Sequence, residues 1–123
     1  MKTSEIKQLS EDELRQRYAD AARQYRVIAA GNDVFGAEQQ AAVIEQIYQE
    51  LKSRGKNPQN SLLSLLDHDD PAVLRWAAAH ALKFAPGMGK PVLEKLATKS
   101  LGFLSGDAQT VLREWQKTHK SGG

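Results

Sequence analysis

The sequence of 123 residues contains no cysteine. This lack excludes disulfide frameworks, thiolate zinc sites, iron–sulfur clusters and cysteine nucleophiles, so the stability of the chain must come from packing. A chain without cysteine is also typical of the cytoplasm, and we expect a cytoplasmic protein.

Long apolar runs are missing as well. Residues 1–10 contain three charged side chains and lack the apolar core of a secretory signal. No segment elsewhere approaches the roughly 18 consecutive apolar residues that cross a membrane. We therefore expect no membrane partner.

Histidine is scarce, and its three copies share no spacing that could hold zinc. His80 lies four residues from both Trp76 and Phe84, in an aromatic row on one helix face, which predicts a core histidine. Residues 67–70 form an acidic turn, but the turn directly precedes Pro71, where a capping aspartate is expected. We therefore expect no metal site, no cofactor and no enzymatic activity.

Charge is unevenly distributed along the chain, although the formal net charge is only +2. Up to Asp70 there are nine basic and twelve acidic residues, whereas from Pro71 onward there are eight basic and three acidic residues. The C-terminal half is thus electropositive, a feature that can favour nucleic acid.

Apolar side chains recur at helical spacing through most of the sequence. Ser10 and Glu13 have the spacing of a capping box and predict a helix over Glu11–Ala30. A second apolar stripe, followed by basic residues and a glycine, predicts a helix over Gly36–Arg54. The short turn between the two helices favours antiparallel neighbours.

The remaining patterns predict helices over about 59–66, 71–85, 90–98 and 107–118. The helix over 71–85 is apolar on most of its circumference, which is typical of a buried central helix, and leaves only Ala72, Arg75, Ala79 and Lys83 for solvent. No alternating pattern indicates a strand. The sequence therefore predicts an all-α domain at residues 11–118, with six helices in three antiparallel pairs between flexible segments at 1–10 and 119–123.

The stretch Leu62–Leu82 resembles a HEAT repeat, in which two helices are joined by an acidic turn with proline. The longer stretch Tyr48–Trp115 is similar to a small bacterial family of unknown function with a HEAT-like or armadillo-like fold. The resemblance implies an α-α superhelix. The repeat's usual arginine directly follows its valine, whereas here Leu74 takes that place and Arg75 comes one residue later.

Helical solenoids expose a concave face lined by the second helix of each pair, and this face serves as a binding platform. We therefore predict a protein-interaction module, with an immunity or antitoxin-type protein as one version, whose partner protein is unidentified and whose oligomeric state stays open. The alternative is a nucleic-acid-binding protein that uses the basic C-terminal half. The predicted partner-binding residues are Glu45, Gln49, Arg75, Ala79, Lys83, Arg113 and Lys117.

Overall fold

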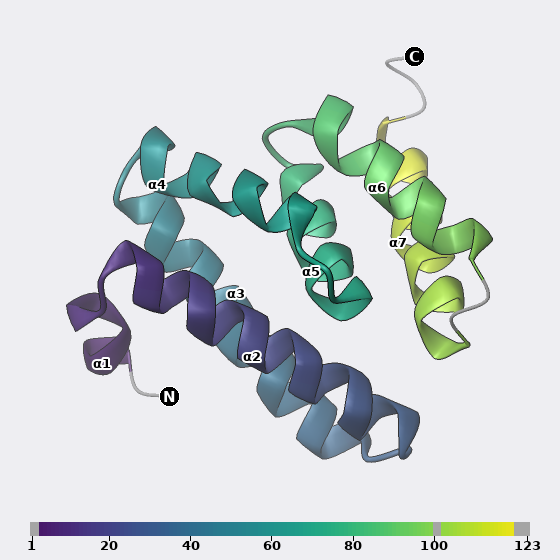
Figure 1. Cartoon of the computed structure of the whole chain (residues 1–123), viewed down its shortest axis with the longest axis horizontal. Coiled ribbons are helices and arrows are strands. Elements are labelled where there is room, and N and C mark those ends of the chain that lie inside the picture. Colours follow the sequence, from purple (N-terminus) through teal and green to yellow (C-terminus); the bar gives the residue numbers. More distant parts are fainter. Residues whose placement is uncertain (1–2, 100–101, 120–123) are drawn as a thin grey trace. The chain divides into compact units, whose positions relative to one another are not determined.

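The structure is a computed structural model that describes residues 3–99 and 102–119, and these residues form helices without any strand (Figure 1). The prediction of an all-α chain is confirmed. The chain divides into two compact units, Met1–Leu65 and Leu66–Gly123. The single domain over residues 11–118 stays a prediction. The elements are α1 (Thr3–Gln8), α2 (Glu11–Ala30), α3 (Val34–Ser53), α4 (Lys56–Asn60), a 3-10 helix (Ser61–Asp67), α5 (Pro71–Ala81), α6 (Pro86–Thr98) and α7 (Phe103–His119).

A capping box starts α2 at the predicted residue. The Glu13 amide donates to the Ser10 hydroxyl oxygen at 3.1 Å, and the Ser10 amide donates to the Glu13 carboxylate at 3.0 Å. These hydrogen bonds favour the ionised carboxyl group and hold the pKa of Glu13 below its ordinary value. The pattern of Ser10 and Glu13 thus sets the start of α2, the first helix of the α2–α3 hairpin.

The first unit is centred on the antiparallel pair of α2 and α3, which lie side by side in Figure 1. Each helix buries one apolar stripe against the other, so the pair encloses the core of this unit. The core side chains of α2 are Leu14, Tyr18, Ala21 and Ala22, and those of α3 are Ala37, Ile44, Ile47, Tyr48 and Leu51.

The turn between α2 and α3 is tight, and α3 begins two residues before the predicted start. Asn32 adopts the left-handed conformation with a φ of 66°, and the Asp33 carboxylate accepts a hydrogen bond from the Gly36 amide at 3.0 Å. Asp33 is therefore the cap, and Gly36 lies inside the helix. A Cβ atom at Gly36 would lie 3.0 Å from Ile28 Cγ2, so glycine permits the close approach of the two helices.

Residues 3–8 form α1, although we expect a flexible segment over 1–10. Ile6 is only 2% exposed, and the Arg54 guanidinium donates to the carbonyl oxygens of Ile6 and Lys7 at 3.4 and 3.1 Å. Arg54 itself pairs with Glu50 at 2.7 Å. This short helix is thus fastened to the C-terminal end of α3 by contacts that span more than forty residues of sequence.

The second unit consists of α5, α6 and α7, with α6 packed on both of the other helices. Several helix ends differ from the expected ones. α5 ends at Ala81 and α6 begins at Pro86, whereas we expect helices over 71–85 and 90–98; the fixed φ of Pro86 suits the first turn of a helix. α7 begins at Phe103, earlier than the expected residue 107, and the expected helix over 59–66 is divided between α4 and the 3-10 helix. The buried cluster of this unit contains Ala78, Leu82, Leu93, Leu96 and Ala108.

The expected tail at 119–123 lies outside the described residues except for His119, the last residue of α7. Among the described helices, none combines the length and the apolar character that crossing a bilayer requires.

Gly89 allows α6 to approach α5 closely, and its replacement tests this packing. A Cβ atom there would lie 2.5 Å from the Ala78 carbonyl oxygen, so we expect Gly89→Ala to lower the free energy of unfolding by about 1 to 3 kcal/mol. Gly87 is the matched control on the same helix, because a Cβ atom added there would meet nothing within 4 Å. Gly87→Ala should leave stability unchanged or raise it by up to about 1 kcal/mol in urea unfolding. Equal effects of both substitutions would contradict this packing.

Candidate functional site

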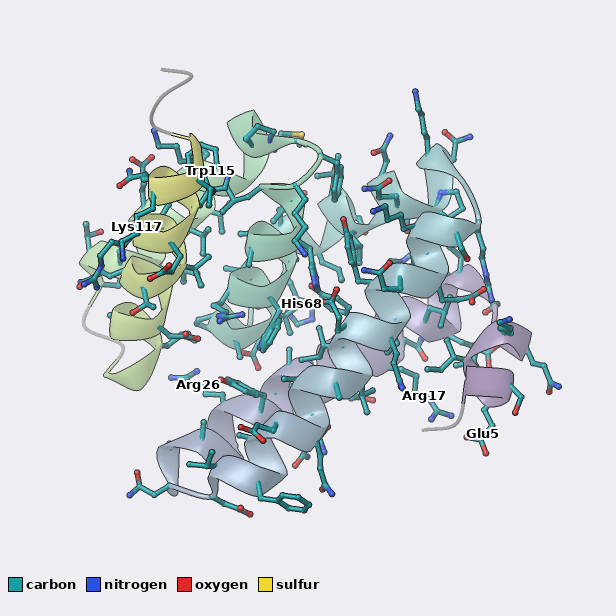
Figure 2. The ribbon with its side chains drawn as sticks, turned by 180° about the vertical axis from the view of Figure 1, so that it is seen from behind. Glu5, Arg17, Arg26, His68, Trp115 and Lys117 are labelled. Atoms are coloured by element: carbon teal, nitrogen blue, oxygen red, sulfur yellow. The ribbon has the colours of Figure 1, made fainter. Side chains whose placement is uncertain are left out.

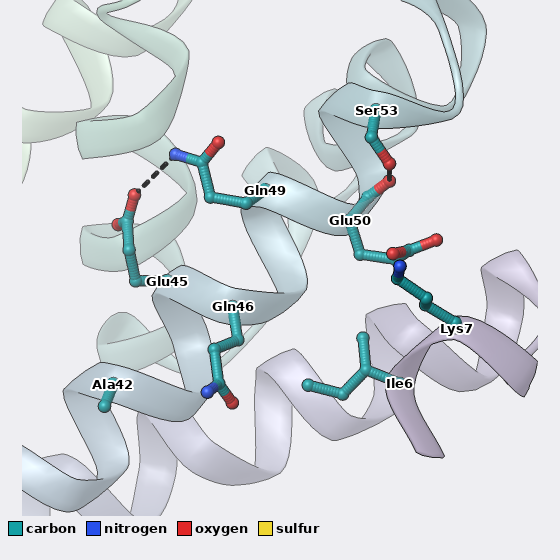
Figure 3. Close-up of a pocket in the computed structure, with 8 residues that line it drawn as sticks. All are labelled: Ile6, Lys7, Ala42, Glu45, Gln46, Gln49, Glu50 and Ser53. Atoms are coloured by element: carbon teal, nitrogen blue, oxygen red, sulfur yellow. Dashed lines mark hydrogen bonds between the residues drawn. The ribbon is translucent and has the colours of Figure 1, made fainter. Parts of the chain in front are cut away.

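A shallow pocket of about 510 Å³ lies between α1 and α3 in the first unit (Figure 3). Two features place it there: α1 is held against the end of α3 by long-range contacts, among them those of the buried Ile6, and the neighbouring face of α3 carries small and polar side chains. The lining residues are Ile6, Lys7, Ala42, Glu45, Gln46, Gln49, Glu50 and Ser53.

The polar side chains of the pocket are partly engaged with one another. The Gln49 amide nitrogen donates to a Glu45 carboxylate oxygen at 3.1 Å, and the two side chains point toward each other in Figure 3. Ser53 donates to the Glu50 backbone carbonyl at 2.8 Å, while the Glu50 carboxylate pairs with Arg54. The pocket therefore offers two amide groups, two carboxylates and the ammonium group of Lys7 beside apolar carbon atoms, a set that suits recognition of a polar segment.

Two of the predicted partner-binding residues, Glu45 and Gln49, meet in this pocket. The pocket also contains Ile6 and Lys7 from α1, which sequence reasoning missed because it treated the first ten residues as flexible. The signal that could have identified them is an isolated isoleucine in a polar segment directly ahead of a strong helix cap.

Arg75 is buried, which corrects the prediction that it lies on an exposed binding face. It is 9% exposed, and its Nε and Nη2 atoms donate to the two carboxylate oxygens of Asp107 at 2.6 and 3.1 Å. The guanidinium carbon also lies 4.0 Å from the centre of the Trp76 ring. Ala72, predicted to face solvent as well, is 1% exposed. Arg75 thus joins α5 to the second turn of α7 and is a structural residue.

The other four predicted residues lie in the second unit without meeting in a pocket that the structure describes. Ala79 is half-buried on α5, and Lys83 is exposed in the turn that follows it. Arg113 and Lys117 are exposed on α7, where Lys117 pairs with Glu114 at 3.5 Å. Of the seven predicted residues, only Glu45 and Gln49 therefore meet in a pocket that the structure describes, and both belong to the first unit.

The acidic turn caps α5 through Asp70, as predicted. Its carboxylate accepts from the Ala72 amide at 2.9 Å, and its own amide donates to His68 Nδ1 at 3.0 Å. Within residues 3–99 and 102–119, no three side chains of histidine, aspartate or glutamate come together in a way that could hold a metal ion. His80 is 3% exposed, with its ring centre 6.2 Å from that of Trp76, which confirms the predicted core histidine.

The uneven charge of the sequence largely disappears when it is counted by unit. The boundary falls between Leu65 and Leu66, so the acidic turn belongs to the second unit with the basic residues. Residues 1–65 contain nine basic and nine acidic side chains, and residues 66–123 contain eight basic and six acidic side chains. The basic half of the sequence is therefore not a strongly basic folded unit.

A second hollow of about 540 Å³ lies on the first unit, lined by side chains of α1, α2 and α3. Its walls carry Glu5 and Arg17, which are labelled in Figure 2, and Asp20, which pairs with Arg23 of the same helix. These charged groups are typical of a solvated surface, so the pocket between α1 and α3 is the better candidate for a binding site.

Comparison with known proteins adds a family and a fold. Residues 12–116 match the model of a family described as a domain of unknown function, DUF2019. The crystal structure of protein RPA1889 from Rhodopseudomonas palustris CGA009 is similar, with a TM-score of 0.82 and 24% identity over 91% of this chain and 93% of that chain. This likeness shows the fold alone. None of the curated proteins compared with the chain matches it.

The Arg75–Asp107 pair predicts a large effect of mutation at Arg75. Arg75→Ala leaves the Asp107 carboxylate, whose side chain is 14% exposed, without its bidentate partner. We expect the free energy of unfolding to fall by about 3 kcal/mol in chemical denaturation. Arg113→Ala, at an exposed position of α7, is the control and should stay within about 0.5 kcal/mol. If Arg75→Ala changes the free energy of unfolding as little as the control does, the structural role of Arg75 is contradicted.

Proposed function

Since the chain belongs to the DUF2019 family of domains of unknown function, we propose that it is a non-enzymatic protein-interaction module that binds a partner protein at the pocket between α1 and α3. The observation that carries this proposal is the composition of the pocket. The exposed Ala42 lies beside the amides of Gln46 and Gln49 and the carboxylate of Glu45, and the buried Ile6 side chain lines the same pocket. Apolar surface with a few polar groups that fix orientation is typical of recognition sites.

The chemistry of the pocket suits a peptide segment of a protein. A glutamine side chain both donates and accepts hydrogen bonds, so Gln46 and Gln49 can pair with the peptide groups or polar side chains of a partner. Glu45 favours a segment that carries a basic residue nearby. The open form of the pocket, on the surface of two helices, fits docking of a partner surface better than enclosure of a small molecule.

The helix pairs fit the HEAT-like or armadillo-like relationship that the sequence resembles, and we include it in the proposal. Such proteins bind partners on faces built from successive helices, with little chemistry of their own. The nearly balanced charge of both units supports a protein partner over nucleic acid, whose binding depends on neutralising phosphates with basic side chains.

Ala42 offers a sharp test, because a large charged side chain there would fill the pocket without disturbing the core. Ala42 is exposed, so Ala42→Arg should leave the thermal melting curve unchanged but reduce capture of a stoichiometric partner from host lysate by at least about tenfold. Gln16→Arg, on the exposed face of α2, is the matched control and should capture the partner normally.

Two outcomes would contradict the proposal. Equal capture by Ala42→Arg and the wild-type chain would move the binding surface away from this pocket. Retention on nucleic acid at low salt, with an affinity that falls steeply as salt rises, would favour the nucleic-acid alternative.

A further inference from the structure

The outward face of α3 carries a continuous uncharged stripe. Its six residues follow one another at intervals of four and three, and all of them are exposed. In Figure 2, which views the molecule from behind, α3 lies in front of α2. By its sequence positions the stripe is opposite to the face that α3 buries. We call Phe35, Gln39, Ala42, Gln46, Gln49 and Ser53 the α3 seam.

The neighbouring helix α2 shows that this composition is unusual for a solvated face. Both helices have 20 residues, and each has nine exposed residues. Five of the nine are charged on α2, compared with two on α3, and none of the seam residues is charged. The exposed face of a surface helix ordinarily carries charged and polar residues. The α3 seam has polar residues but no charge, and it is therefore poorer in charge than the corresponding face of α2.

The shape of the seam suits a helix. Its residues lie along one straight edge of α3, so a second helix can lie lengthwise against all six. From Phe35 to Ser53 the seam rises over 18 residue steps, or about 27 Å of helix. Ala42 and Ser53 are small enough for close approach, and Phe35, at 71% exposed, provides a large apolar anchor at one end.

The charged residues beside the seam identify that helix. Glu38, Glu45 and Lys52 follow one another at intervals of seven, so they form one row along a single edge of the seam. In an antiparallel pair of α3 helices centred near Glu45, Glu38 of each copy faces Lys52 of the other. In a parallel pair the two copies of this row would lie on opposite edges of the interface, so Glu38 of one copy could not reach Lys52 of the other. The row is thus self-complementary in the antiparallel arrangement.

Glu45 lies near the centre of this arrangement, where the two copies of its carboxylate approach each other. Each one accepts a hydrogen bond from Gln49 of its own chain, and this donor offsets part of the repulsion. The two attractive pairs between Glu38 and Lys52 therefore decide the orientation.

We propose that a second copy of this chain docks on the α3 seam, with the two α3 helices antiparallel and with Glu38 of each copy paired with Lys52 of the other. This inference rests on the proposed function, because the seam contains Ala42, Gln46 and Gln49 of the pocket, and it names the partner at that site.

Charge exchange in the full chain tests the pairing by sedimentation equilibrium. Glu38→Lys and Lys52→Glu each turn both attractive pairs into repulsive ones, so each should raise the dimer dissociation constant by at least about tenfold. The double variant restores opposite charges and should return to within about threefold of the wild-type chain. Gln16→Lys on α2 is the control and should dimerise normally.

The natural absence of cysteine permits a second measurement that does not depend on charge. Gln46→Cys places a single thiol on the seam near the centre of the antiparallel pair, and mild oxidation should convert the chain to a covalent dimer on a non-reducing gel. Gln16→Cys on the opposite helix should stay largely monomeric under the same conditions.

Three outcomes would overturn the inference. A wild-type chain that stays monomeric throughout the measured concentration range excludes self-pairing; if Ala42→Arg then still abolishes capture of another protein, the proposed function survives without it. A dimer that both single variants leave intact places the interface elsewhere. A dimer that the single variants disrupt but the double variant does not restore contradicts the antiparallel pairing of Glu38 with Lys52.

Discussion

Burial of one apolar stripe on each helix is the constraint on which the structure depends, since the chain has no disulfide bond to hold it together. In the first unit α2 and α3 satisfy this constraint against each other, and Gly36 lets them approach closely near their turn. In the second unit α6 packs on both α5 and α7, and Gly89 has the same role against Ala78. At Gly89 a side chain would meet the backbone of α5, whereas at Gly36 it would meet first the capping Asp33 carboxylate and then the end of the Ile28 side chain.

Features that depend on neighbouring residues could be predicted from the sequence, and features that depend on distant ones could not. The cap at Ser10 and the cap at Asp70 involve partners within three residues, and both occur where local patterns indicated. By contrast, Arg54 reaches a carbonyl oxygen 48 residues away, and Arg75 reaches a carboxylate 32 residues away. No spacing rule identifies such partners, so α1 and the buried state of Arg75 were missed.

The candidate site shows the same division. Glu45 and Gln49 lie one helical turn apart, so their shared face follows from periodicity alone, and the structure joins them by a hydrogen bond. The other wall of the pocket comes from α1, whose position depends on burial of Ile6 and on the guanidinium of Arg54. The sequence also suggested that the C-terminal half is strongly basic. The boundary after Leu65 places the acidic turn in the same unit as the basic residues that follow it, so the net charge of that unit is small.

The two faces of α3 connect the fold to the proposed function. Its inner face contains Ile44, Ile47 and Leu51 and obeys the rule that apolar residues are buried. Its outer face is poorer in charge, with two charged residues among nine exposed ones compared with five among nine on α2. Natural proteins tend to break such local rules at functional surfaces. The hairpin itself does not require an uncharged outer stripe, and the proposed pairing of two α3 helices gives that stripe a role.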